Sequence, residues 1–233
     1  MTLKTHQRLL TILLAIASAG TTALIGLNVW ARRDAPADSG NAQFKNTPPL
    51  GVPVLHGVPP FTLTQRDGST VANAQLLGKV WVADFIFTRC AGPCRVMSRQ
   101  MAGLQERLGD HPSARDIRLV SISVDSEYDT EPVLRRYAQE FEADAIMWLF
   151  LRGPGATVQK LVVDGFKLPL ERNTDPNDPI IHSQRFVLVD QAGHVRGYYN
   201  GTPQEGPGGE TLPAEMDALL RDLELVLAES EPE

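Results

Sequence analysis

Residues 78–97 have the sequence GKVWVADFIFTRCAGPCRVM, and this stretch decides the fold. Its first half, 80–88, is mostly apolar and rich in aromatic and β-branched residues, which is typical of a central strand buried on both faces. Pro93 suits the first position of a helix, and apolar residues follow it at helical spacing as far as Leu108. The stretch therefore predicts a buried strand that runs directly into a helix, with two cysteines at the junction.

Outward from this junction, strand-like and helical segments alternate along the chain. The pattern predicts a hairpin over 60–71, strands over 117–124 and 146–151, helices over 132–141 and 157–166, a second hairpin over 185–200, and a closing helix over 213–228. Such an order predicts an α/β fold with a mixed sheet and helices on both faces. Because both cysteines lie at the first strong strand-to-helix junction, the arrangement is thioredoxin-like.

The N-terminal segment predicts export from the cytoplasm. Residues 9–30 are 22 uncharged residues, which as a helix would span about 33 Å, enough to cross a hydrocarbon core. We expect 1–33 to be an uncleaved transmembrane helix, with a cleaved signal peptide as the alternative because Ala17-Ser18-Ala19 offers a cleavage site. A single-pass inner-membrane protein with its C-terminal domain in the periplasm fits best.

Composition defines the remainder as a proline-rich linker and one acidic domain. Residues 34–60 hold six prolines and predict a linker, so 61–233 is expected to be the folded domain. The formal net charge is −6, and the first 33 residues carry only cations, which leaves the domain more acidic than the whole chain. An acidic domain without a basic, aromatic-rich stripe argues against nucleic-acid binding.

Cys90 and Cys94 are the two cysteines of the chain, so its thiol chemistry lies at one place. Cys94 is expected in the first turn of the helix, where free N–H groups favour a thiolate, and Cys90 on the loop before it. Three interpretations remain open: a structural disulfide, a redox-active dithiol, and a metal site. Two thiolates in an exported domain favour copper(I) over harder ions, whereas the three-residue spacing departs from the usual oxidoreductase motif.

A two-thiolate copper site needs a third ligand to hold both oxidation states, and imidazole suits it. The histidines of the chain are His6, His56, His111, His182 and His194. His182 stands just before a strand and after a turn-rich loop, 173–179, that could swing over the cysteine edge of the sheet. Position alone leaves a structural role for His182 open.

At this point the sequence resembles the Sco/SenC family of copper chaperones. The resemblance covers roughly 61–200 and is carried by GKVWVADFIFTRCAGPC, VSISVDSEYDT and IIHSQRFVLVDQAGHVRGYYNG. It implies a thioredoxin fold, one copper ion held by Cys90, Cys94 and His182, and a role in cytochrome c oxidase assembly. The chain departs from many members in lacking a proline directly after each cysteine.

Several further residues have two possible roles each. Asp125 matches a family aspartate at a strand's end and is a possible neighbour of the site, or else a turn residue. Asp84 lies inside an apolar strand and would be costly there unless paired. Arg89 and Arg95 flank the thiols and either favour thiolates or meet an acidic partner, or are simply solvated. Met97 and Met101 are possible soft ligands, although helical spacing favours core positions.

The resemblance leaves three functions to compare. The first is a metallochaperone that delivers copper to the dinuclear copper site of an oxidase subunit. The second is a thiol-disulfide reductase of that subunit's cysteines, itself served by a thiol reductase, and the third is a copper or redox sensor. A thiol peroxidase is disfavoured, because no proline lies upstream of Cys90 in the strand. We also expect copper and a Cys90–Cys94 disulfide to exclude each other, and the loop before His182 to become ordered only when copper binds.

Overall fold

The computed structural model describes residues 51–90, 92–173, 180–207 and 211–229. The predicted transmembrane segment, 9–30, lies outside these residues, and within them no helix is long and apolar enough to cross a membrane. The described residues all belong to one compact unit, Pro49–Glu233.

Eight strands form the main sheet, in the order β1-β10-β9-β4-β5-β6-β2-β3. Their bounds are β1 His56–Gly57, β2 Thr62–Gln65, β3 Thr70–Ala72, β4 Val80–Ile86, β5 Ile117–Ser123, β6 Trp148–Arg152, β9 Arg185–Val189 and β10 His194–Asn200. Two small antiparallel pairs lie outside it: β7 Leu170–Arg172 with β8 Ile180–His182, and β11 Gln204–Glu205 with β12 Thr211–Leu212. β4, β5 and β6 are parallel, and β9 and β2 pair antiparallel to them. The predicted mixed α/β sheet is confirmed.

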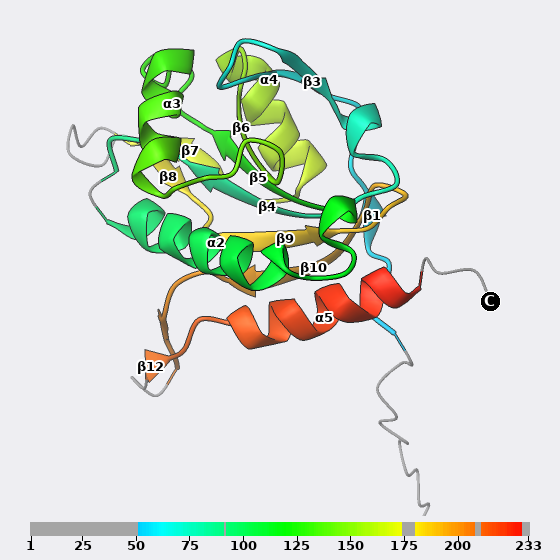
Figure 1. Cartoon of the computed structure of the whole chain (residues 1–233). Helices are drawn as coiled ribbons and strands as arrows, with labels where there is room; N and C mark the ends of the chain where they lie inside the picture. Colours follow the sequence, from blue (N-terminus) through cyan, green and yellow to red (C-terminus); the bar gives the residue numbers. More distant parts are fainter. Residues whose placement is uncertain (1–50, 91, 174–179, 208–210, 230–233) are drawn as a thin grey trace, which may run out of the picture. The chain divides into compact units, whose positions relative to one another are not determined.

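The helices cover both faces of this sheet (Figure 1). Their bounds are α2 Pro93–Gly109, α3 Glu131–Glu140, α4 Gly155–Lys160, which continues as a π-helical turn Leu161–Gly165, and α5 Met216–Ala228; short 3-10 turns span Asn73–Leu76 and Ala114–Asp116. The apolar residues of α2, α3 and α5 pack in one core cluster, and those of α4 pack in a second cluster on the opposite face.

Strand β4 is fully buried and contributes to both core clusters. Val80, Val82 and Ile86 point to the α2 side, whereas Trp81, Ala83 and Phe85 point to the α4 side. Two-sided burial explains why this strand is almost continuously apolar. The one exception is Asp84, which is fully buried on the α2 side between Val82 and Ile86.

The folded domain begins earlier than the sequence predicted. Residues 51–60 were assigned to the linker, but His56 and Gly57 form β1 and pair with Val195 and His194 of β10. The side chain of Val52 is buried in the core. A two-residue edge strand in a proline-rich context leaves no periodicity in the sequence, so the pattern does not reveal that the domain begins before residue 61.

Candidate metal centre

The two cysteines lie at the junction of β4 and α2, as predicted. A turn follows β4 and is closed by the Cys90 backbone N–H, which donates to the Phe87 carbonyl at 3.1 Å. Pro93 is the first residue of α2, and Cys94 is the second. Cys90 therefore sits on the turn and Cys94 in the first turn of the helix. Both are buried, and they are not joined by a disulfide.

His182 is brought to the same place by the topology of the sheet. β9 runs antiparallel to β4 and begins beside the carboxyl end of β4, so the residues just before β9 meet the cysteine turn. The Nε2 atom of His182 lies 3.2 Å from Sγ of Cys94. The structure thus joins two of the three predicted ligands directly.

The orientation of the His182 ring suits a ligand role. Its Nδ1 lies 2.9 Å from the carbonyl oxygen of Ser183, and a carbonyl can only accept, so we assign the proton to Nδ1. The Nε2 lone pair then faces Cys94. A backbone carbonyl that fixes the tautomer in this way is the usual support of a metal-binding histidine. The edge of the ring also packs against Phe87, with 5.6 Å between ring centroids.

His182 is more firmly held than the sequence predicted. It ends β8, where it pairs with Leu170 of β7, so it stands in a strand and not at the end of an unanchored loop. His182 itself therefore has a backbone partner, and the ordering of the loop before it by copper stays a prediction. The turn residues before it, 174–179, lie outside the described residues.

A small cavity lies beside Cys90 and His182. Its volume is about 80 Å³, and its lining residues are Phe87, Cys90, Pro93, Ile180, Ile181, His182 and Gln184. A volume of this size admits an ion or a few water molecules but no organic substrate of ordinary size.

The pKa of the Cys94 thiol is raised, contrary to the expected thiolate. A hydrogen bond with Cys90 is the largest cause, burial is the second, and the nearby charge of Asp84 adds to them. A hydrogen bond between the Cys94 sulfur and the Phe87 backbone lowers the pKa of Cys94, but by less than the other effects raise it. A helix N-terminus lowers the pKa of a thiol, but burial in apolar surroundings raises it, and at Cys94 the raising effects are larger.

The donor set fits a soft ion, although its geometry would have to adjust. Within the described part of the chain, no three His, Cys, Asp or Glu side chains already stand in a metal-holding arrangement. Donor atoms that share one ion at ordinary bond lengths lie about 3.5–3.8 Å apart, so the Cys94–His182 distance of 3.2 Å must open slightly. Two thiolates and one imidazole suit copper better than calcium or magnesium, which take oxygen ligands.

Two carboxylates hold the residues that lead into Cys90. Asp125 is buried and accepts a hydrogen bond from Nε of Arg89 at 2.7 Å, which places it beside the cysteine turn as the sequence suggested. Asp129 is also buried and binds Thr88. Sequence reasoning missed Asp129, because its partner Thr88 lies 41 residues earlier in the sequence.

The remaining candidates lie elsewhere. Met97 and Met101 are fully buried in the core, as predicted. Arg95 pairs with Glu140 at 2.8 Å, away from the thiols. Of the other described histidines, His56 bonds to the Tyr198 hydroxyl, His111 to Glu224, and His194 stands near Asp190.

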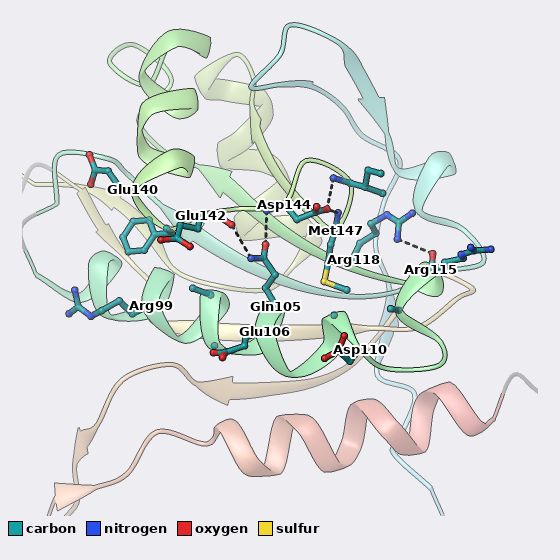
Figure 2. Close-up of a pocket in the computed structure, with 16 residues that line it drawn as sticks. Arg99, Gln105, Glu106, Asp110, Arg115, Arg118, Glu140, Glu142, Asp144 and Met147 are labelled. Carbon is teal, nitrogen blue, oxygen red and sulfur yellow. Dashed lines mark hydrogen bonds between the residues drawn. The ribbon is translucent and has the colours of Figure 1, made fainter.

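A much larger hollow of about 1060 Å³ runs along the outer side of α2. Its lining mixes basic and acidic side chains, and none of its lining residues is a cysteine or a histidine. Figure 2 shows how Gln105 bridges this hollow, donating to the carbonyl of Glu142 at 3.0 Å and accepting from the backbone N–H of Asp144 at 2.7 Å. Its lining includes the thioether of Met147 but no thiolate or imidazole to complete a copper site.

A known protein family matches most of this chain. The family model described as SCO1/SenC matches residues 54–213. The chain belongs to the SCO1/SenC family. The "SCO1 protein homolog" of Bacillus subtilis is 35% identical over 150 residues, which are 64% of this chain and 76% of that protein.

Solved members of the family share the fold. BsSco, described as a member of the Sco family of cytochrome c oxidase assembly proteins, matches with a TM-score of 0.63 and 31% identity, over 76% of this chain and 97% of that one. The ScoI structure of Bradyrhizobium japonicum with copper bound matches with a TM-score of 0.58 and 22% identity, over 72% of this chain and 98% of that one. At that identity the second likeness concerns the fold alone.

Proposed function

We propose that this protein binds one copper ion through Cys90, Cys94 and His182 and delivers it to the dinuclear copper site of a respiratory cytochrome oxidase during assembly. The observation that carries the proposal is the 3.2 Å contact between Cys94 Sγ and His182 Nε2, next to a small cavity that Cys90 and His182 line. Family membership supports it, since BsSco is described as a member of a family of oxidase assembly proteins, and ScoI has been solved with copper bound.

The chemistry of the site favours binding and transfer over turnover. Two thiolates satisfy copper(I), and the imidazole adds the harder donor that copper(II) prefers. Because the cavity has room for an ion but not for an organic substrate, the ion is the cargo. Copper binding replaces the thiol protons, so affinity should rise with pH.

Copper titration of the reduced protein under anaerobic conditions tests the proposal. Wild type should bind one copper ion, and Cys90→Ser or Cys94→Ser should abolish high-affinity binding. His182→Ala should weaken copper(II) binding more than copper(I) binding. The matched control is His194→Ala, which removes a histidine from the far end of β9 and β10 and should leave both affinities unchanged. Full affinity in either serine variant would place the site elsewhere.

Transfer is tested separately with the isolated copper-accepting oxidase subunit. The copper-loaded protein should lose its ion to the reduced subunit in stoichiometric amounts, and the His182→Ala variant should not carry copper(II) to it. If copper stays on this protein while the subunit's thiols change oxidation state, the delivery role is wrong.

That outcome would favour the second candidate, a thiol-disulfide reductase of the subunit's cysteines. The observation that favours it is the hydrogen bond between Cys90 and Cys94, since two buried thiols in contact can close to a disulfide. A thiol reductase would then have to restore the dithiol. The two roles use the same sulfur atoms, and the transfer experiment separates them by what leaves the protein. A copper or redox sensor would neither deliver copper to the subunit nor reduce its cysteines.

The place of action is the periplasmic side of the inner membrane, with 1–33 as a single-pass anchor. The uncharged run 9–30 supports this proposal. A reporter fused after Pro60 should be active only outside the cytoplasm, and a reporter active only in the cytoplasm would contradict it.

A further inference from the structure

The turn that carries Cys90 is fastened to the sheet by side chains from another segment. Since the Cys90 N–H bonds to the Phe87 carbonyl, Thr88 and Arg89 are the two central residues of this turn. Both of them bond to carboxylates that follow β5. We call these two carboxylates, Asp125 and Asp129, the carboxylate clamp.

Asp129 makes the larger number of these contacts. One carboxylate oxygen accepts from the Thr88 hydroxyl at 2.6 Å. The other accepts from the Thr88 backbone N–H at 3.2 Å and from the Ser123 hydroxyl at 2.6 Å. The side chain of Asp129 is fully buried, so the three donors replace the water that it has lost. Asp129 thereby ties the cysteine turn to the end of β5.

A backbone hydrogen bond joins the two residues of the carboxylate clamp. The backbone N–H of Asp129 donates to the Asp125 carbonyl at 2.9 Å, which closes the turn between β5 and α3. Asp125 then bonds to Arg89 through its side chain at 2.7 Å. α3 begins at Glu131, directly after this turn. The clamp therefore transmits the position of β5 and α3 to Thr88 and Arg89.

Cys94 does not depend on the carboxylate clamp for its position. It belongs to α2, whose backbone fixes it, whereas Cys90 lies on the turn before the helix. The relative position of the two sulfur atoms thus depends on how the turn is held. Burial raises the pKa of Asp129, which shows that placing this carboxyl here costs free energy. An apolar residue would fill the space at lower cost, but it could not hold Thr88 by its donors.

We propose that Asp129 is a positioning residue that sets the place of the Cys90 sulfur relative to Cys94 and His182. The proposal rests on the proposed function for its purpose, because a two-thiolate site needs both sulfurs at bonding distance from one ion. Its physical content, the confinement of Cys90 by Asp129, can be measured without copper.

The copper-free test uses the full-length chain in a Cys94→Ser background, where Cys90 is the one remaining thiol of the sequence. The rate of Cys90 alkylation by iodoacetamide is measured with and without Asp129→Ala. Removing the clamp should raise this rate about tenfold or more, because the turn then opens more often. Thr88→Val removes only the hydroxyl donor and should raise it less.

The matched control is Asp190→Asn. Asp190 is also a buried carboxylate that closes a turn, accepting from the Ala192 and His194 backbone N–H groups and pairing with Arg196, but it lies at the other end of β9. It should destabilise the domain without changing the alkylation of Cys90 more than twofold. An unchanged rate in both Asp129→Ala and Thr88→Val, or an equal increase in Asp190→Asn, would overturn the proposal. If Asp129→Ala does not fold, Thr88→Val decides.

The copper arm adds a spectroscopic signature in proteins with both cysteines. Copper(II) loaded on Asp129→Ala should lose about half of its sulfur-to-copper charge-transfer intensity. Cys94 and His182 keep their places in this variant, but the Cys90 sulfur is no longer held at bonding distance from the ion. Full intensity would contradict positioning. If wild type binds no copper, the proposed function fails, while the alkylation result still decides the role of Asp129.

Discussion

Replacing Asp84 by asparagine should change how the stability of the domain depends on pH. Asp84 lies in the middle of β4, is fully buried, and neither of its carboxylate oxygens has a well-formed hydrogen bond. Ser121 stands opposite Asp84 on β5 and acts to lower the pKa of this carboxyl. The Ser121 hydroxyl also accepts a hydrogen bond from the indole N–H of Trp148 at 2.9 Å. Burial is the dominant effect and raises the pKa of Asp84 from 3.8 to about 7.

The magnitude follows from linkage between protonation and folding. The folded state keeps Asp84 protonated up to about pH 7, whereas the unfolded chain releases this proton near pH 3.8. The stability contributed by the neutral carboxyl is therefore fully present below pH 3.8 and is lost as the pH rises to about 7. At about 1.4 kcal/mol for each tenfold change in proton affinity, the loss is about 4 kcal/mol.

Urea unfolding of the reduced protein between pH 4 and pH 8 measures this loss. An asparagine at this position cannot ionise, so the stability difference between Asp84→Asn and wild type isolates the carboxyl. The variant should gain about 4 kcal/mol relative to wild type between about pH 4 and pH 7, with no further change above. A difference that does not vary with pH would refute the reasoning, because it would show that Asp84 is either solvated or held by a partner as a carboxylate.

Three further predictions concern the thiols, the core and the N-terminal edge. Oxidising Cys90 and Cys94 to a disulfide should abolish copper binding until reduction, because an oxidised pair has no thiolate to offer; equal affinity before and after reduction would refute this. Met97→Leu should retain copper binding and cost less than about 1.5 kcal/mol of stability, as expected of a core residue, and loss of copper would instead make it a ligand. Arg196→Met should destabilise the fold by about 3 kcal/mol, because buried Arg196 pairs with Asp190 and bonds to the carbonyls of Val52 and Pro53. Denaturant unfolding measures this, with the exposed Arg221→Met as a control that should change stability by less than about 1 kcal/mol.

The sequence predicts the centre of the fold well because the signals there are strong and local. The apolar run over 80–88 and Pro93 place a buried strand and a helix start, and the structure confirms β4 and α2 with Cys94 in the first helical turn. His182 lies near the cysteines because β9 pairs with β4, which is far from it in sequence. The residues around His182 do not encode that pairing. Its place after a turn-rich loop made His182 a candidate but left a structural role open, and the resemblance to a family favoured the ligand role.

The features that the sequence missed depend on tertiary context. β7 and β8 are three residues each and of mixed polarity, so no periodicity distinguishes them from a loop. The helix start at Cys94 favours a thiolate, but burial and Cys90 reverse this, and burial is not readable from the local sequence. Asp129 gives no local signal, because its side chain bonds to Thr88, 41 residues earlier in the sequence.

X-ray absorption at the copper edge of the copper(I)-loaded, reduced protein tests the central claim most directly. The proposed site predicts one copper ion with two sulfur neighbours and one imidazole nitrogen. Cys90→Ser should not retain this copper signal, and His182→Ala, which still binds copper(I) through its two thiolates, should lose the imidazole neighbour. Nitrogen and oxygen neighbours alone, or an unchanged spectrum in His182→Ala, would contradict the assignment of Cys90, Cys94 and His182 as the copper ligands.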